Sequence, residues 1–278
     1  MGRKIGGRKI FLIFVMPIEC DFRFPVLERE AFQHLDYRVM ACAFASHREL
    51  GRHCTEEIYR NDLMGRLKAE GIGPLHSEVL VRVRHHRFVK DYRLDLVVAQ
   101  QCIYELKVAR SIAPNHEGQT LNYLLLTDCA HGKVLNFFPA SLESRFVNNS
   151  LTRQERIRFT LTQDQWQGGE ELKRAMIAAV EDLGLFLETA LYNQILVHHF
   201  GGAELAMQNQ PIFRNAQVLG WQPFQMCGPD EAFRVTALTS RVAAQQTSFL
   251  KLLALTNLKA FHWINMNRHS LHFTTLTV

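Results

Sequence analysis

The sequence predicts an α/β protein in which a mixed β-sheet is flanked by helices, and in which this arrangement occurs twice. Two observations lead to this prediction. Two helical stretches are followed by segments with the alternation of strands, and residues 103–142 align without a gap to residues 232–271. This succession is typical of helices layered on a sheet. We expect an N-terminal extension at 1–30, a first domain at 31–155 and a degenerate second copy at 156–278.

The first predicted elements are two helices, over residues 28–50 and 55–70. In the first, Leu35 and Val39 fall on one face at the spacing of an amphipathic helix. Gly51 separates the two helices, and a segment rich in glycine and proline ends the second.

Strand periodicity begins after this pair of helices. Residues 78–84 alternate apolar and polar side chains, as a half-buried strand does, and Ala99–Gln101 forms a tight turn between two further strands. Three strands, a helix and a fourth strand are expected at 78–84, 92–98, 102–108, 115–129 and 133–138, in that order.

An internal repeat relates this region to the last third of the chain by a shift of 129 residues. The identical pairs are Ser111/Ser240, Leu121/Leu250, Leu124/Leu253, Leu126/Leu255, Thr127/Thr256, Asn136/Asn265, Ser141/Ser270 and Leu142/Leu271. Residues 183–192 also echo residues 50–59 at a slightly different offset. We predict a duplication that folds as an internal pseudo-dimer. The alternative is that leucines on two helical faces coincide by chance.

Composition excludes several classes of protein. Hydrophobic residues make up 47% and charged residues 21% of the 278 residues, which excludes a disordered chain. The longest apolar run, residues 10–16, is too short to span a membrane. A formal net charge of +5 permits a polyanionic partner without requiring one.

The cysteines and the N-terminus indicate a cytoplasmic protein. None of the six cysteines forms a CxxC pair, so we expect reduced thiols and no zinc ribbon or iron–sulfur cluster. Basic residues precede the apolar run at 10–16 as in a signal peptide, but no small-residue cleavage site follows. Either Met1 or Met16 is a possible start of the chain.

Asp95, Glu105 and Lys107 interrupt the apolar runs of the strands predicted at 92–98 and 102–108. Glu105 and Lys107 share one face of their strand, and the preceding hairpin can bring Asp95 beside them. Two converging carboxylates can hold Mg²⁺ or Mn²⁺, and a neighbouring lysine can orient a water molecule at a scissile phosphate. The alternative from these residues alone is an ion pair on a strand.

Several motifs resemble a known family when taken together. Residues 47–59 carry a glycine–glutamate–tyrosine signature with Glu56 three residues before Tyr59, although Arg52-His-Cys54 stands where a glycine-rich stretch is usual. The further motifs are Asp95-Leu-Val-Val98, Ile103-Tyr-Glu-Leu-Lys-Val108, Pro114-Asn-His-Glu-Gly-Gln-Thr-Leu-Asn-Tyr-Leu124 and Gly132-Lys-Val-Leu-Asn-Phe137. In order and spacing, residues 33–147 resemble the bacterial GxxExxY family of the PD-(D/E)XK nuclease superfamily.

The resemblance implies a restriction-endonuclease-like fold and metal-dependent hydrolysis of DNA phosphodiester bonds. By resemblance, Asp95 and Glu105 bind Mg²⁺ or Mn²⁺ together with the main-chain carbonyl of Leu106. Lys107 is then the catalytic lysine, and Glu56 the accessory acidic residue.

Gln119 and Tyr123 look like the QxxxY motif of nuclease domains in recombination helicase–nucleases. One helical turn apart, they can face the same site. The resemblance implies that Gln119 contacts the lysine or a phosphate and that Tyr123 contributes to nucleic-acid binding.

A group of basic residues near this site suggests a nucleic-acid partner. Arg82, Arg84, Arg87 and Lys90 lie on one predicted strand and the turn after it, and Arg110 follows Lys107 closely. Such residues can track a phosphate backbone. They can equally protect a solvated edge strand.

The second copy lacks the chemical residues of the first. Under the shift of 129, Asp95, Glu105, Lys107 and Gln119 become Phe224, Arg234, Thr236 and Ser248. We therefore predict one active centre per chain, with the second copy as scaffold or DNA-contact surface. The histidines of this copy match no strong zinc spacing, and no metal site is predicted there.

These observations favour a metal-dependent nuclease with DNA as partner and no membrane association, either a monomer with an internal pseudo-dimer or a homodimer. The alternative is a non-catalytic nucleic-acid-binding or assembly protein that retains the nuclease fold.

Overall fold

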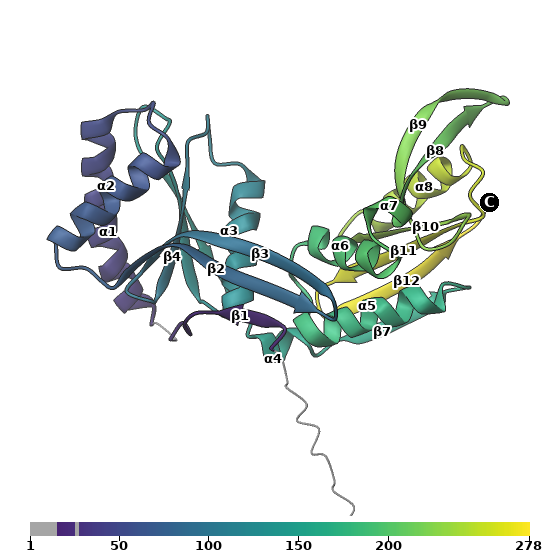
Figure 1. The fold of residues 1–278 in the computed structure, drawn as a ribbon, viewed down its shortest axis with the longest axis horizontal. Coiled ribbons are helices and arrows are strands. Elements are labelled where there is room, and N and C mark those ends of the chain that lie inside the picture. The colour runs from purple at the N-terminus through teal and green to yellow at the C-terminus, as the bar shows by residue number, and fades with distance from the viewer. Residues whose placement is uncertain (1–15, 26–27) are drawn as a thin grey trace, which may run out of the picture.

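Two six-stranded mixed sheets, each flanked by helices, form the protein in the computed structural model (Figure 1). The structure describes residues 16–25 and 28–278. Most of the predicted N-terminal extension, with its basic and apolar stretch, lies outside the described residues. No described helix is long and apolar enough to cross a membrane.

The first unit spans residues 16–148 and the second unit residues 153–276. The elements of the first are β1 (Ile18–Cys20), α1 (Arg29–Leu50), α2 (Glu56–Ala69), β2 (Leu75–His85), β3 (Phe88–Val98), β4 (Cys102–Lys107), α3 (Pro114–Thr127), β5 (His131–Asn136) and β6 (Glu143–Asn148). Those of the second are α4 (Arg153–Arg156), β7 (Thr160–Gln165), α5 (Glu170–Leu183), α6 (Thr189–His199), α7 (Ala203–Ala206), β8 (Met207–Arg214), β9 (Gln217–Met226), β10 (Glu231–Thr236), α8 (Val242–Leu253), β11 (Ala260–Asn267) and β12 (Ser270–Leu276).

The helices and strands predicted for the first unit are confirmed, although the hairpin strands β2 and β3 are longer than expected. Along β2 every second residue is buried from Val79 to His85, which is the alternation seen in the sequence. Ala99 and Gln100 have φ of 55° and 54°, the backbone of the tight turn expected between β3 and β4.

Five strands of each sheet share one topology, whereas the sixth strand differs: β1 lies antiparallel beside β2, and β7 lies parallel beside β12. In β2–β3–β4–β5–β6 the successive pairings are antiparallel, antiparallel, parallel and antiparallel, and β8–β9–β10–β11–β12 repeats this series. In both units a helix, α3 or α8, connects the two parallel strands. Strands β4 and β10 begin and end at positions 129 residues apart, which is the shift found in the sequence.

One tyrosine–glycine contact occurs in both units at the joint between the first two helices. The Tyr59 hydroxyl donates to the carbonyl of Gly51, 2.6 Å away, where α1 has ended and α2 is about to begin. The Tyr192 hydroxyl donates to the carbonyl of Gly184 between α5 and α6. Both tyrosines are fully buried, and both glycines have positive φ, 73° and 81°. The glycines permit the left-handed turn, and the tyrosines satisfy a carbonyl that the helix leaves free.

One asparagine contact is repeated as well. Asn136, at the end of β5, accepts a hydrogen bond from the N–H of Ala109 at 3.0 Å and donates to the Ala109 carbonyl at 2.8 Å. Asn265 on β11 makes the same pair of bonds with Leu238, at 2.8 and 3.0 Å. In each unit the amide therefore holds the segment that leaves the central strand.

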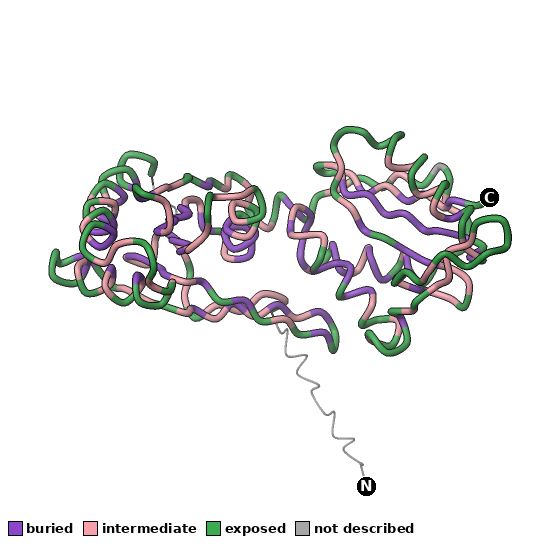
Figure 2. Tube along the Cα trace, turned by 90° about the horizontal axis from the view of Figure 1, so that it is seen from above, coloured by how far each residue is buried: buried purple, intermediate pink, exposed green. Residues whose placement is uncertain are grey.

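Helices cover both faces of the first sheet. Apolar residues of α1 and α2, such as Val39 and Leu63, pack on one face, and α3 packs on the other through residues such as Leu124. The core on the α3 side continues into α5, α6 and the second sheet, while α8 covers the far face of that sheet. Figure 2 shows buried residues inside both units, with exposed residues on turns and outer helix faces.

A buried arginine connects the two units. Arg156 is fully buried, and its guanidinium donates to the carbonyl of Leu125 on α3 at 2.7 Å and to that of Leu183 at the end of α5 at 2.8 Å. Gly184 leaves room for this side chain, because a Cβ there would lie 2.7 Å from the Arg156 Cβ.

Replacing Arg156 by methionine should lower the free energy of unfolding by about 3 kcal/mol, because buried carbonyls in both units lose their donors. Urea denaturation of the full chain measures this loss. The exposed Arg158→Met serves as the matched control and should change stability by less than about 0.5 kcal/mol. Equal stabilities of the two variants would show that Arg156 does not connect the units.

Candidate active site

The candidate site lies where β3 and β4 stop pairing. The backbone ladder runs from Val98/Cys102 to Leu96/Tyr104, and Asp95 and Glu105 would form the next pair. Beyond this point a side chain replaces the backbone partner, because Asp95 Oδ2 accepts a hydrogen bond from the Leu106 N–H at 2.8 Å. The two carboxylates predicted from the sequence therefore lie side by side on neighbouring strands.

Glu105 and Lys107 project from the same face of β4, as the strand alternation predicted. Lys107 Nζ donates to Glu105 Oε1 at 2.7 Å. The Glu105 side chain is only 1% exposed, and among the described residues its second oxygen, Oε2, has no hydrogen-bond partner. A buried carboxylate oxygen without a partner is costly, so this atom is free to bind a cation.

The electrostatics of the site are those of crowded carboxylates. Burial, and then repulsion from Asp95, raise the pKa of Glu105 to about 8. Burial also raises the pKa of Asp95, against the lowering effect of the Leu106 N–H. Burial alone would lower the pKa of Lys107, but Glu105, Asp95 and Glu56 outweigh it and raise that pKa above its usual range. The site thus holds an excess of carboxylates over cations, as metal sites do.

Glu56 contacts the same region from the first turn of α2. Its Oε1 accepts a hydrogen bond from the Val108 N–H at 3.1 Å, one residue after Lys107. The neighbouring Glu57 is exposed, so the choice of Glu56 agrees with the geometry. Its charge raises the pKa values of Asp95 and Glu105, which places it within electrostatic reach of both.

Gln119 and Tyr123 form a pair on α3. Gln119 Nε2 donates to the Tyr123 hydroxyl at 2.8 Å. Tyr123 is buried, and burial together with the charges of Glu105 and Asp95 raises its pKa to about 12, although the Gln119 bond acts in the opposite direction. Tyr123 is therefore within electrostatic reach of the carboxylates, and it holds Gln119 rather than lying open to a ligand.

Most of the predicted basic group already has acidic partners. These ion pairs are Arg82 with Asp91 at 2.7 Å, Arg84 with Glu19 at 2.9 Å and Lys90 with Glu188 at 2.8 Å. The strand alternation put Arg82 and Arg84 on the outer face correctly, but it did not show that acidic partners would neutralise them.

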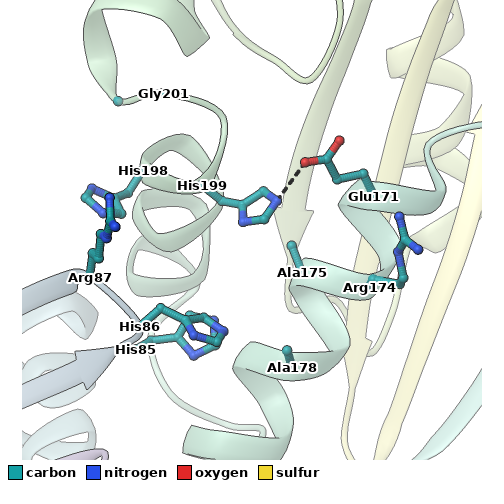
Figure 3. A pocket seen from close by; sticks show the side chains of 11 residues that line it. His85, His86, Arg87, Glu171, Arg174, Ala175, Ala178, His198, His199 and Gly201 are labelled. Atoms are coloured by element: carbon teal, nitrogen blue, oxygen red, sulfur yellow. Dashed lines mark hydrogen bonds and ion pairs between the residues drawn. The ribbon is translucent and has the colours of Figure 1, made fainter.

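Arg87 and Arg110 are the exposed members of that group. Arg110 makes no hydrogen bond or ion pair with any residue in the described part of the chain. Arg87, at the tip of the β2–β3 hairpin, lines a cavity of about 870 Å³. Other lining residues are His85 and His86 from the hairpin, Glu171 and Arg174 from α5, and His198 and His199 from α6 (Figure 3). This cavity lies seven or more residues along the hairpin from Asp95, roughly 23 Å at the rise of a strand, so it is separate from the carboxylates.

Two residues near the carboxylates were missed by sequence reasoning. Arg60, one turn after Glu56 on α2, lowers the pKa of Asp95 by its charge and forms an ion pair with Glu78. Asn136 holds the segment that follows Lys107, as described above. The identity of Asn136 and Asn265 in the repeat was the available signal for the second residue, while the helical spacing from Glu56 was the signal for Arg60.

The corresponding place in the second unit has other side chains where the first unit has its carboxylates and lysine. Thr236, at the position of Lys107, bonds to Asn265 at 2.7 Å and accepts a hydrogen bond from the Trp263 indole N–H at 2.8 Å. Arg234, at the position of Glu105, is exposed. This unit therefore has no carboxylate pair at that point.

Comparison with known proteins finds a similarity over most of the first unit. Residues 33–147 match the family model of the PD-(D/E)XK nuclease superfamily, a class of metal-dependent nuclease folds. The crystal structure of SSO0001 is similar at 19% identity over 44% of this chain and 62% of that protein, with a TM-score of 0.29. The match thus spans less than two thirds of that protein, and we draw no conclusion from it. No curated protein matches the chain.

The raised pKa of Glu105 predicts a pH-dependent stability of the metal-free protein. Because the folded pKa is about 8 and the usual value is 4.5, the unfolded chain releases its proton first, and stability falls as pH rises from about 4.5 to about 8. Glu105→Gln should remove this loss, which amounts to about 4 kcal/mol at pH 8.5 and is small at pH 4.5. Urea denaturation in chelator at both pH values measures it. The exposed Glu57→Gln is the control, and the prediction fails if all three proteins show the same pH dependence.

Proposed function

We propose that the chain is a divalent-metal-dependent nuclease that hydrolyses phosphodiester bonds in DNA at a single centre in the first unit. The observation that carries this proposal is the buried, unpartnered Glu105 Oε2 beside Asp95 and Lys107, within the segment that matches the nuclease superfamily. A structural ion pair alone would satisfy both oxygens of the glutamate.

The residues present fit a hard divalent cation. Asp95 and Glu105 supply carboxylate oxygens, and the main-chain carbonyl of Leu106 is a further candidate ligand between Glu105 and Lys107. Oxygen ligands of this kind suit Mg²⁺ or Mn²⁺. When bound, the ion supplies Lewis-acid activation of the phosphate and lowers the pKa of a bound water.

The chain's own residues have distinct roles in this proposal. In the structure Lys107 Nζ donates a hydrogen bond to Glu105. In the reaction its ammonium group would orient the attacking water and offset negative charge at the phosphate. Glu56 fixes the backbone after Lys107 through Val108, and so sets the direction of the lysine side chain. Gln119 would donate to a phosphate oxygen, held in place by Tyr123.

Nucleic-acid contacts are assigned in this proposal chiefly to Arg110 and Arg87, the two members of the predicted basic group that are exposed and form no ion pair with a described residue. Arg82, Arg84 and Lys90 contribute less, because each is neutralised by a carboxylate. An exposed arginine close to Lys107 in the sequence is well placed to meet the phosphates that flank a scissile bond.

We further propose that the second unit is a degenerate copy that acts as scaffold. The shared topology, the repeated tyrosine–glycine contact and the repeated asparagine contact support this, because chance alignment of leucines would reproduce none of them. One centre per chain favours nicking or end processing over a concerted double-strand cut. A monomer with an internal pseudo-dimer and a cytoplasmic location complete the proposal.

Metal-dependent cleavage should depend on the carboxylates and the lysine. On labelled single-stranded, duplex and branched DNA with Mn²⁺ or Mg²⁺, Lys107→Ala and Glu105→Gln should each lower the rate at least about 100-fold. Glu56→Gln should lower it about tenfold, while the adjacent Glu57→Gln should leave it unchanged. Cleavage that survives Glu105→Gln would overturn the assignment, and tight DNA binding without cleavage would favour the non-catalytic alternative.

Binding should respond differently to two arginines. Arg110→Ala should weaken DNA binding several-fold and reduce the salt slope by about one ion, because a phosphate contact is lost. Arg82→Ala should change affinity by less than about twofold, since Asp91 already neutralises that side chain. Fluorescence anisotropy in chelator, over a range of salt concentrations, measures both. Equal losses of DNA affinity in the two variants would contradict the assignment of phosphate contacts to Arg110 rather than to Arg82.

A further inference from the structure

A mixed group of metal-ligating side chains lies in the second unit, away from the candidate active site. Cys227, Glu231 and His262 bring one sulfur, one carboxylate oxygen and one imidazole nitrogen within 4.8 Å of one another. Glu231 begins β10, and His262 is the third residue of the parallel strand β11. The group therefore lies near the N-terminal ends of these strands, whereas the candidate active site lies at the C-terminal end of β4.

A hydrogen-bonded turn fixes the positions of Cys227 and Glu231 relative to each other. The Cys227 N–H donates to the Glu231 carbonyl at 2.9 Å across the turn between β9 and β10, and the Cys227 thiol lies 3.5 Å from the same carbonyl oxygen. The spacing of three intervening residues is therefore fixed by the backbone. The main-chain hydrogen bond of the turn therefore brings the two possible metal ligands, a thiol and a carboxylate, close together.

The hydrogen bonds around His262 leave one ring nitrogen facing a carboxylate. Thr275 Oγ1 donates its single proton to the Gln167 carbonyl at 3.0 Å, so it can only accept from His262 Nδ1, which lies 3.1 Å away. Nδ1 therefore carries a proton. In the neutral ring Nε2 then carries no proton, and its lone pair faces Glu231 Oε2, another acceptor, at an Nε2–Oε2 distance of 3.3 Å. Two acceptors at this distance repel each other unless a metal ion lies between them or a proton on Nε2 makes the ring an imidazolium.

Neighbouring residues pack around the His262 ring, while the Glu231 side of the group is open to solvent. His262 is fully buried, and Trp166 packs against it with the ring centroids 4.9 Å apart. A Cβ at Gly169 would lie 3.1 to 3.2 Å from atoms of the imidazole, so the missing side chain at that position makes room for the ring. The Glu231 side chain is 37% exposed, which leaves the outer side of the group open to solvent.

We propose that Cys227 Sγ, Glu231 and His262 Nε2 bind one Zn²⁺ ion, with a water molecule as the fourth ligand. A thiolate, an imidazole and a carboxylate suit zinc. The Thr275 hydroxyl accepts from the other ring nitrogen, Nδ1, and so orients the imidazole, as hydrogen-bond partners of zinc-bound histidines do. On binding, the Cys227 S–H bond breaks, the sulfur bonds to zinc and the proton passes to solvent. The ion connects the β9–β10 turn to β11. This site is independent of the proposed nuclease centre, and the C-x₃-E turn was the sequence signal for it.

Cobalt is the probe that tests this site. The full chain, stripped with chelator under reducing conditions, is titrated with Co²⁺ and followed by absorption. We expect a thiolate-to-cobalt charge-transfer band that saturates at one equivalent and is bleached by Zn²⁺. Cys227→Ser should abolish the band. Cys20→Ser, which changes another partly buried thiol, should leave it intact.

Two further variants keep the test decisive. Glu231→Gln changes a partly exposed side chain and retains the sulfur, so it should keep the band while weakening Co²⁺ binding at least about tenfold. Glu105→Gln should leave the band and the affinity unchanged, which separates this site from the nuclease centre. The proposal is overturned if the parent protein shows no charge-transfer band, since His262 and Glu231 then form only an ion pair. It is equally overturned if the band survives Cys227→Ser.

Discussion

The separation of β3 and β4 after Leu96 and Tyr104 is the constraint on which the candidate site depends. A regular antiparallel ladder would have continued to pair Asp95 with Glu105 through the backbone. Here the Asp95 carboxylate takes over the Leu106 N–H, so the strands part without leaving a buried donor unpaired. The cost of opening the sheet is thereby offset by the same residue that would bind a metal.

The candidate site contains more carboxylates than basic side chains. Asp95, Glu105 and Glu56 face Lys107, with Arg60 further away, and the raised pKa of Glu105 expresses that imbalance. A protein selected for stability alone would be expected to pair or remove such a buried carboxylate. The surrounding apolar core, in which residues of β4 and α3 are fully buried, can bear this local cost. Local destabilisation carried by a stable scaffold is the usual physical arrangement of a metal-dependent active site.

The two units share main-chain contacts but not the charged side chains of the candidate site. The contacts that recur in both, tyrosine to glycine carbonyl and asparagine to the backbone of the departing segment, satisfy main-chain groups. Main-chain groups are present whatever the side chains are, so these contacts can form in both units although Arg234 and Thr236 stand at the positions of Glu105 and Lys107. The position of Lys107 is held in the second unit by Thr236 in a neutral network. Arg156, between the units, likewise bonds to main-chain carbonyls, and its one ion pair among the described residues, with Asp128, is longer at 3.7 Å.

The sequence by itself determined the three helices and four of the strands of the first unit, without β1 and β6, and the grouping of Asp95, Glu105 and Lys107. Helical and strand periods are local properties, and a short hairpin places residues of adjacent strands side by side, so few long-range contacts are needed to predict them. Only the tertiary structure decided which arginines are free, because Glu19 and Glu188 meet Arg84 and Lys90 from 65 and 98 residues away. It also brought Cys227 and Glu231 to His262, through the parallel pairing of β10 with β11. Contacts between segments far apart in the chain depend on how the sheets assemble, and no local pattern records them.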